Sequence, residues 1–92
     1  MNIAEVNKAI SKCFGIKVTD LKSPCRNREL VDARQLAWKI LKDNGYGICE
    51  LGRAYDRNHG AVGKGIKRIS GLIEVHRKIE AIYKQVKEEL CC

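Results

Sequence analysis

Residues 47–70, GICELGRAYDRNHGAVGKGIKRIS, decide the fold because they contain two helical patterns separated by a tight turn. Ile48, Leu51 and Tyr55 share one face of a short helix. After the turn, apolar residues recur at helical spacing, at Val62, Ile66, Ile69 and Ile73. The pattern predicts a helix-turn-helix over about residues 47–70.

The face opposite this apolar stripe is smooth and basic. It contains Arg57, Gly60, Ala61, Lys64, Lys67 and Arg68. Each glycine inside a helix costs roughly 1 kcal/mol relative to alanine, so Gly60, Gly63 and Gly65 need a reason. Close approach of the helix backbone to a partner or to a neighbouring helix would be one, and a weak, frayed helix is the alternative.

Other kinds of site fit this stretch poorly. A phosphate-binding loop needs G-x-x-x-x-G-K-[ST] after a strand, but Asn58 takes the first glycine position and Gly65 takes the place of the hydroxyl residue. His59, His76 and the scattered cysteines lack metal-ligand spacing. No paired carboxylates or nucleophile–base pair can be recognised, so we expect no enzyme, cofactor, metal or small-molecule substrate.

The rest of the chain also has helical spacing. We expect a helix over about 2–14 that ends at Gly15, and a second helix from about Arg28 to the sequence DNG at 43–45. The loop between them contains Pro24 and a possible single turn capped by Thr19 or Asp20. A last helix is expected over about 72–90. Together these segments predict one all-α domain over 1–92, a bundle of about five helices with its core in residues 3–70.

Length and composition agree with one small domain. The chain has 92 residues, 45% of them hydrophobic, which is enough for a single core. We see no membrane span or signal peptide, and the five cysteines form no C-x-x-C pair, so a cytoplasmic protein with reduced thiols is expected. The apolar stripe over 75–86 is expected to pack on the first helix, giving a monomer; a homodimer seam is the alternative.

The net charge of +7 is unevenly distributed. Residues 26–42 contain five basic and two acidic residues, and residues 57–71 contain four basic residues and no acidic one. The acidic segment 43–56 separates them. Two such basic segments are typical of a surface that binds a polyanion, although a merely solubilising surface is the alternative. A recognition helix in a DNA major groove fits this pattern, with Lys64, Lys67 and Arg68 against phosphates.

Three stretches carry a family resemblance: VTDLKSPCRNRELVDARQLAWKIL at 18–41, ELGRAYDRNHGAV at 50–62 and KRI at 67–69. They resemble the C-terminal DNA-binding domain of the bacterial replication initiator DnaA, whose fold is similar to that of the tryptophan repressor. The resemblance covers about residues 3–70. It implies a minor-groove contact by Arg26, with Arg28 beside it. It also implies that Arg34, Gln35 and Lys42 lie near the phosphate backbone.

The recognition helix departs from the family pattern. The family signature reads Arg-Asp-His-Ser/Thr-Thr-Val, where this chain has Arg57-Asn58-His59-Gly60-Ala61-Val62. The amide of Asn58 can pair with adenine, whereas aspartate suits cytosine. Gly60 and Ala61 lack hydroxyls, and only Ala61 keeps a methyl group for thymine. The turn before the signature is also one residue shorter than the common family form. We therefore expect phosphate contacts to be kept and base contacts to weaken.

The expected function is a stand-alone module that binds double-stranded DNA. Helix 58–70 would enter the major groove and the Arg26 loop the minor groove. A full initiator carries an ATPase domain with a phosphate loop, and Met1–Cys92 contains none. The alternative is a protein-interaction module that keeps the fold and has lost specific DNA binding. RNA binding is the weakest hypothesis, because aromatic residues make up only 5% of the chain.

Overall fold

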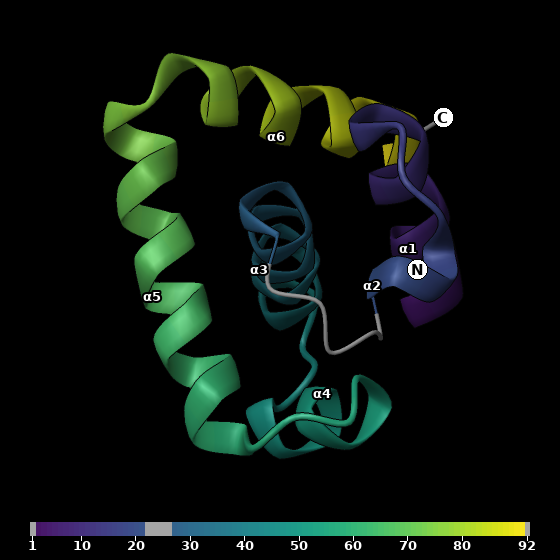
Figure 1. Ribbon diagram of the computed structural model, residues 1–92, viewed down its shortest axis with the longest axis vertical. Coiled ribbons are helices and arrows are strands. Elements are labelled where there is room, and N and C mark those ends of the chain that lie inside the picture. The colour runs from purple at the N-terminus through teal and green to yellow at the C-terminus, as the bar shows by residue number, and fades with distance from the viewer. Residues whose placement is uncertain (1, 22–26, 92) are drawn as a thin grey trace.

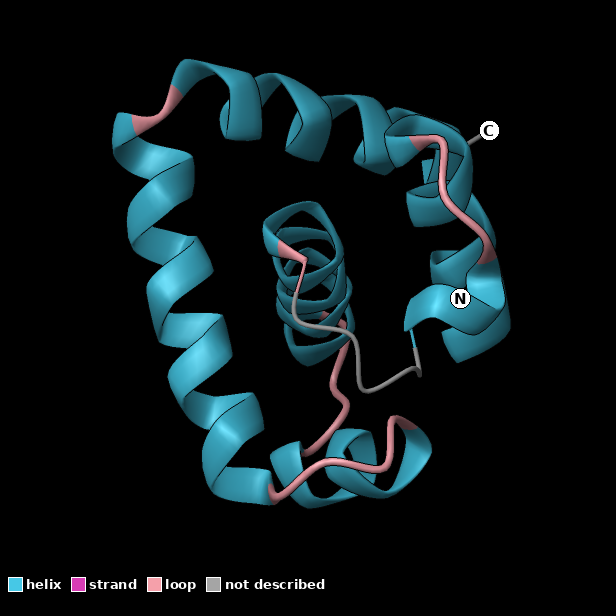
Figure 2. Ribbon diagram, in the orientation of Figure 1, coloured by secondary structure: helices cyan, strands magenta, loops and turns pink. Residues whose placement is uncertain are grey.

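The computed structural model describes residues 2–21 and 27–91, and these residues form helices and loops without a strand (Figure 2). The described helices are α1 (Ile3–Phe14), α2 (Val18–Leu21), α3 (Arg28–Asp43), α4 (Ile48–Ala54), α5 (His59–Val75) and α6 (Arg77–Cys91). Figure 1 looks along α3, which lies in the middle, with α5, α6, α1 and α4 around it. The predicted all-α bundle is confirmed.

Local caps set the helix ends that the sequence predicted. The Asn2 side chain accepts a hydrogen bond from the Glu5 N–H at 2.8 Å and begins α1. Gly15 ends α1 in the left-handed conformation, with φ of 68°, and Gly45 follows α3 with φ of 97°. The expected single turn after Gly15 is α2, so the described residues form six helices rather than five.

The core is built around α3. Its buried apolar residues are Ala33, Leu36, Ala37, Trp38, Ile40 and Leu41. Val6 and Ile10 of α1 and Val62 and Ile69 of α5 belong to the same apolar cluster. Trp38 is only 4% exposed, which confirms its expected core position, and its ring meets the Tyr55 ring edge to face at 5.9 Å. The predicted inner stripe of α5 is therefore its core-facing side.

Tyr55 joins the end of α4 to α1 through a buried hydrogen bond. Its hydroxyl donates to Oδ1 of Asn7, and both side chains are buried. Burial raises the pKa of the Tyr55 hydroxyl, and the bond to Asn7 opposes that shift. A buried amide oxygen that loses its donor carries a desolvation penalty, so this pair fixes where α4 lies against α1.

The boundary before the last helix was predicted wrongly. Leu72 and Val75 were expected in a last helix over about 72–90, but α5 continues to Val75 and the chain turns at His76, whose φ is −110° and ψ is 107°. Val75 is 80% exposed and therefore lies outside the packed stripe. The three-and-four spacing of apolar residues continues through both helices, so it could not locate the turn.

The extended conformation at His76 lets α6 fold back over α1, as Figure 1 shows at the top of the molecule. Ile79 and Val86 of α6 are buried, and α6 contacts both α1 and α5. Lys12 of α1 and Glu89 of α6 form an exposed ion pair at 3.2 Å. The expected packing of the last helix on the first is confirmed.

Among the described residues, no helix is long and apolar enough to cross a membrane.

Gly65 allows α5 to lie directly against α3. A Cβ at this position would be 2.7 Å from Cζ3 of Trp38, which is too close for real atoms, and 3.0 Å from Cγ of Gln35, which is tight. A Cβ at Gly63 would meet nothing within 4 Å. The expectation that a helical glycine marks close approach to a neighbouring helix is thus confirmed for Gly65, and Gly63 has no such contact.

We predict that Gly65→Ala lowers the free energy of unfolding by about 1–3 kcal/mol, because the new methyl group must displace the Trp38 ring. Gly63→Ala is the matched control, since it changes the same helix at an open position. It should raise stability by about 0.5–1 kcal/mol. Thermal and urea unfolding followed by circular dichroism measures both. Equal effects of the two substitutions would contradict the packing argument.

We predict that Tyr55→Phe lowers the free energy of unfolding by about 1–3 kcal/mol, because it leaves the buried Asn7 oxygen without its donor. Tyr83→Phe is the control, as the Tyr83 hydroxyl is exposed and 3.5 Å from Asp43 Oδ2.

The folded-state pKa of Tyr55 is raised above its ordinary value of 10.0. Tyr55 therefore contributes stability that is present below pH 10 and is lost as pH rises, and urea unfolding should show this loss in the wild type but not in Tyr55→Phe.

Candidate nucleic-acid interface

The turn between α4 and α5 is closed by backbone contacts. The Arg57 N–H donates to the carbonyl oxygen of Gly52 at 2.7 Å, and a Cβ on Gly52 would be 2.7 Å from the Arg57 oxygen. Asp56 has a φ of 53°, a left-handed conformation that aspartate tolerates better than most residues. Neither Gly52 nor Asp56 was predicted from the sequence as a residue that shapes this turn. The glycine inside a seven-residue helix just before a turn was the available signal.

Asn58 begins α5 as its N-cap. Its Oδ1 accepts a hydrogen bond from the Gly60 N–H at 2.8 Å. Aspartate and asparagine are comparable caps, so the departure from the family pattern at this position preserves the start of the helix. The cap bond engages the oxygen that bidentate adenine recognition would also need. Base recognition by Asn58 stays a prediction.

The first turn of α5 is exposed and contains no acidic residue. His59, Gly60 and Ala61 all lie on the surface there. A helix N-terminus carries a partial positive charge from its unpaired N–H groups, and here no carboxylate of the first turn offsets it. This end of α5 therefore offers an anionic partner both donors and small side chains.

Two lysines extend the basic surface along α5. Lys64 and Lys67 are both exposed. Arg57 contacts the turn, since its Nη1 donates to the carbonyl oxygens of Tyr55 at 3.3 Å and Asp56 at 3.2 Å, and its expected DNA contact stays a prediction. Arg57 thus stabilises the turn that positions the first residues of α5.

The structure brings Gln35 and Arg68 together, although 33 positions separate them in the sequence. Nη1 of Arg68 donates to Oε1 of Gln35 at 2.6 Å and to Oδ1 of Asp32 at 2.8 Å. Asp32 is a residue that the sequence analysis did not single out. Asp32 precedes the candidate residue Gln35 by three positions, which places both side chains on one face of a helix. This spacing could have identified Asp32 from the sequence.

Arg34 lies apart from the exposed cations. Its side chain is 5% exposed, and its Nε donates to the Leu21 carbonyl oxygen at 2.8 Å. Leu21 ends α2, so Arg34 holds the end of α2 against α3. The expected phosphate contact of Arg34 stays a prediction. Arg26 lies outside the described residues.

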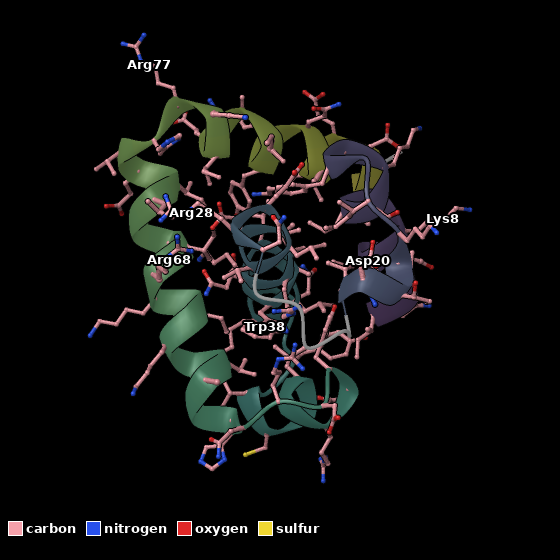
Figure 3. The ribbon with its side chains drawn as sticks, viewed as in Figure 1. Lys8, Asp20, Arg28, Trp38, Arg68 and Arg77 are labelled. Atoms are coloured by element: carbon pink, nitrogen blue, oxygen red, sulfur yellow. The ribbon has the colours of Figure 1, made fainter. Side chains whose placement is uncertain are left out.

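Arg28 and Lys42 lie near opposite ends of α3, and both are exposed. Fourteen residues of helix separate them by roughly 20 Å, at about 1.5 Å per residue. Arg28 and Arg68 line one hollow, and Figure 3 shows their side chains where the start of α3 faces α5. The structure therefore brings Arg28 together with Arg68, whereas Lys42 lies near the other end of α3.

A second, shallower hollow lies at the turn itself. It is lined by Cys49, Gly52, Arg53, Asp56, Arg57, Asn58 and His59. In the part of the chain that the structure describes, no three histidine, cysteine or acidic side chains are grouped to hold a metal ion.

The sequence model of the family described as the bacterial DnaA protein helix-turn-helix matches residues 3–69. The chain is 37% identical over 76 residues to the chromosomal replication initiator protein DnaA of Wolbachia sp. subsp. Brugia malayi (strain TRS), an alignment that covers 80% of this chain and 16% of that protein.

Two further relatives carry the same name. The chain is 30% identical over 92 residues to the DnaA protein of Thermodesulfovibrio yellowstonii (strain ATCC 51303 / DSM 11347 / YP87), covering 94% of this chain and 21% of that protein. It is 32% identical over 82 residues to the DnaA protein of Buchnera aphidicola subsp. Baizongia pistaciae (strain Bp), covering 87% of this chain and 18% of that protein. The chain thus spans between about a sixth and a fifth of these relatives.

We predict that Asn58→Ala lowers the free energy of unfolding by about 1 kcal/mol, because the Gly60 N–H loses its acceptor. Asn58→Asp is the matched control, since it keeps the cap and adds a charge that the helix dipole favours. Its stability should be at least that of the wild type. Urea unfolding followed by circular dichroism measures both, and equal losses in the two variants would contradict the capping role.

Proposed function

Because this chain belongs to the family of bacterial DnaA helix-turn-helix domains, we propose that it binds double-stranded DNA with the start of α5 in the major groove. The exposed, acid-free first turn of α5 is the observation that carries this proposal. The major groove is about 12 Å wide and admits a helix. Gly60 and Ala61 add little bulk, which lets the backbone of this turn approach the base edges closely.

Within the groove, we assign base contacts to His59 and Ala61. His59 is exposed and has polar ring nitrogens, and the Ala61 methyl group suits the thymine methyl. The Nδ2 group of Asn58 takes no part in the cap bond, which uses Oδ1, and could donate to a base. With few polar groups in the groove, discrimination between sequences is expected to be modest.

Phosphate contacts are assigned to exposed cations around the groove. Lys64 and Lys67 extend from α5, and Lys42 extends from the last turn of α3. Arg26 is proposed to enter the minor groove, with Arg28 beside it at the start of α3. These contacts release counterions from DNA and carry most of the affinity, so binding is expected to fall steeply with salt.

We propose that these 92 residues bind DNA by themselves, without an ATP-hydrolysing domain and in the cytoplasm, where DNA is accessible. The compact core and a radius of gyration of 11.7 Å support a unit that folds alone. The relatives are named as chromosomal replication initiators, and that activity belongs to proteins of which this chain spans about a fifth. The proposal therefore covers DNA binding and the regulation of sites by that binding.

A protein-interaction module is the second candidate. Gly60 and Ala61 favour it, because they replace two hydroxyl residues of the family signature at the exposed start of α5. A surface that has lost polar groups for base recognition can still bind a protein through the same fold. The DNA-binding experiment below separates the two functions.

The test is fluorescence anisotropy of a labelled duplex carrying the DnaA family box, beside a scrambled duplex, across a salt series. We predict that both duplexes bind, with a modest preference for the box and an affinity that falls steeply with salt. Lys64→Ala and Lys67→Ala should each reduce the slope of log K against log salt by about 0.9. Failure of both duplexes to bind at low salt would refute DNA binding and favour the protein-interaction module.

Lys84→Ala is the matched control. Lys84 is an exposed lysine of α6 that pairs with Glu80, and its replacement removes the same charge away from the proposed DNA surface. It should leave the slope unchanged. A slope reduced equally by Lys84→Ala would show that only net charge matters and would contradict the assignment of Lys64 and Lys67.

A further inference from the structure

The carboxylate of Asp32 lies beside the basic face of α5 and pairs with one of its cations, Arg68. Asp32 of α3 and Arg68 of α5 form an ion pair, with Nη1 of Arg68 2.8 Å from Oδ1 of Asp32. The Asp32 side chain is 14% exposed and that of Arg68 is 42% exposed. The guanidinium is therefore still accessible to a partner, whereas the carboxylate is mostly covered.

The charges around this pair identify the kind of partner that it faces. The pair lines a hollow together with the charged residues Arg28, Glu29 and Lys78, and the rest of the lining is mostly apolar. Figure 3 shows Arg28 and Arg68 next to each other at this place. Asp32 thus shares this hollow with two arginines, Arg28 and Arg68, and Arg28 is the residue that we propose lies beside the minor-groove contact of Arg26.

We propose that Asp32 is an intramolecular substitute for a DNA phosphate: it holds Arg68 in the free protein and so limits DNA affinity. This inference depends on the proposed DNA-binding function. Carboxylate and phosphate oxygens are alternative acceptors for the same guanidinium donors. When DNA binds, a phosphate takes the place of the Asp32 carboxylate at Arg68, and Gln35 keeps its hydrogen bond to the same guanidinium.

The energetics allow this exchange. A partly exposed ion pair contributes little to stability, so a phosphate can displace the carboxylate. The exchange also changes the salt dependence. A phosphate that pairs with a free arginine releases close to one counterion, but if Arg68 must leave Asp32, the released carboxylate takes up a cation in return. In the wild type, the contact between Arg68 and a phosphate therefore adds little to the slope of log K against log salt.

Asp32→Asn tests the inference, measured with the same duplexes and salt series. We expect about two- to fivefold tighter binding at low salt, the fold-change that corresponds to an ion pair of this strength. The slope of log K against log salt should steepen by up to about 0.9. Glu80→Gln is the matched control, because it also removes one carboxylate from an ion pair, with Lys84 at 3.0 Å, and Glu80 is absent from the lining of the hollow.

Two further variants separate the proposed role from general effects of charge and folding. In an Arg68→Gln background, Asp32→Asn should no longer increase affinity, because no guanidinium is left to release. Asp32→Ala removes the same charge and inserts a strong helix former, so it must reproduce the gain. Circular dichroism of each variant verifies that it is folded.

The outcomes distinguish this inference from the proposed function. If the wild type binds DNA and Asp32→Asn binds no more tightly than Glu80→Gln, the inference is wrong and the DNA-binding function stands. A gain that persists in the Arg68→Gln background also refutes it. If neither the wild type nor Asp32→Asn binds any duplex, the DNA-binding function itself is wrong, and the inference falls with it.

Discussion

The close packing of α5 on α3 at Gly65 is the contact on which the rest of the structure depends. Because Gly65 has no Cβ, the Trp38 ring lies directly against the α5 backbone. The same ring meets Tyr55 edge to face, and Tyr55 donates to Asn7 of α1. One continuous set of contacts thus joins α5, α3, α4 and α1 and sets the angle at which α5 leaves the turn.

This packing determines which side of α5 faces outward. With Val62, Gly65 and Ile69 buried against the core, Lys64 and Lys67 must lie on the surface. Arg68 lies at the edge of the packed face, where it reaches Asp32 and Gln35 of α3. The cations of α5 therefore differ in availability, although the sequence shows them as one basic segment.

Much of the fold could be predicted because it follows from local rules. Helical spacing identified the stripes of α3 and α5, and Gly15 and Asn44–Gly45 marked helix ends through their backbone preferences. The turn at His76 was missed, since apolar residues keep the same spacing on both sides of it. Arg34 shows the limit for the candidate site: the family resemblance implies a phosphate contact, but its buried hydrogen bond to the Leu21 carbonyl oxygen could not be predicted from the sequence.

The sequence by itself determined the helical class, the helix-turn-helix and the family of this chain, because periodicity, capping and motif spacing act over a few neighbouring residues. Only the tertiary structure decided which charged residues are available to a partner. Arg68 meets Asp32 across 36 positions, and Arg34 meets Leu21 across a segment between two helices. Such pairs form when whole helices pack, so no local pattern could reveal that one arginine is held by a carboxylate and the other is buried.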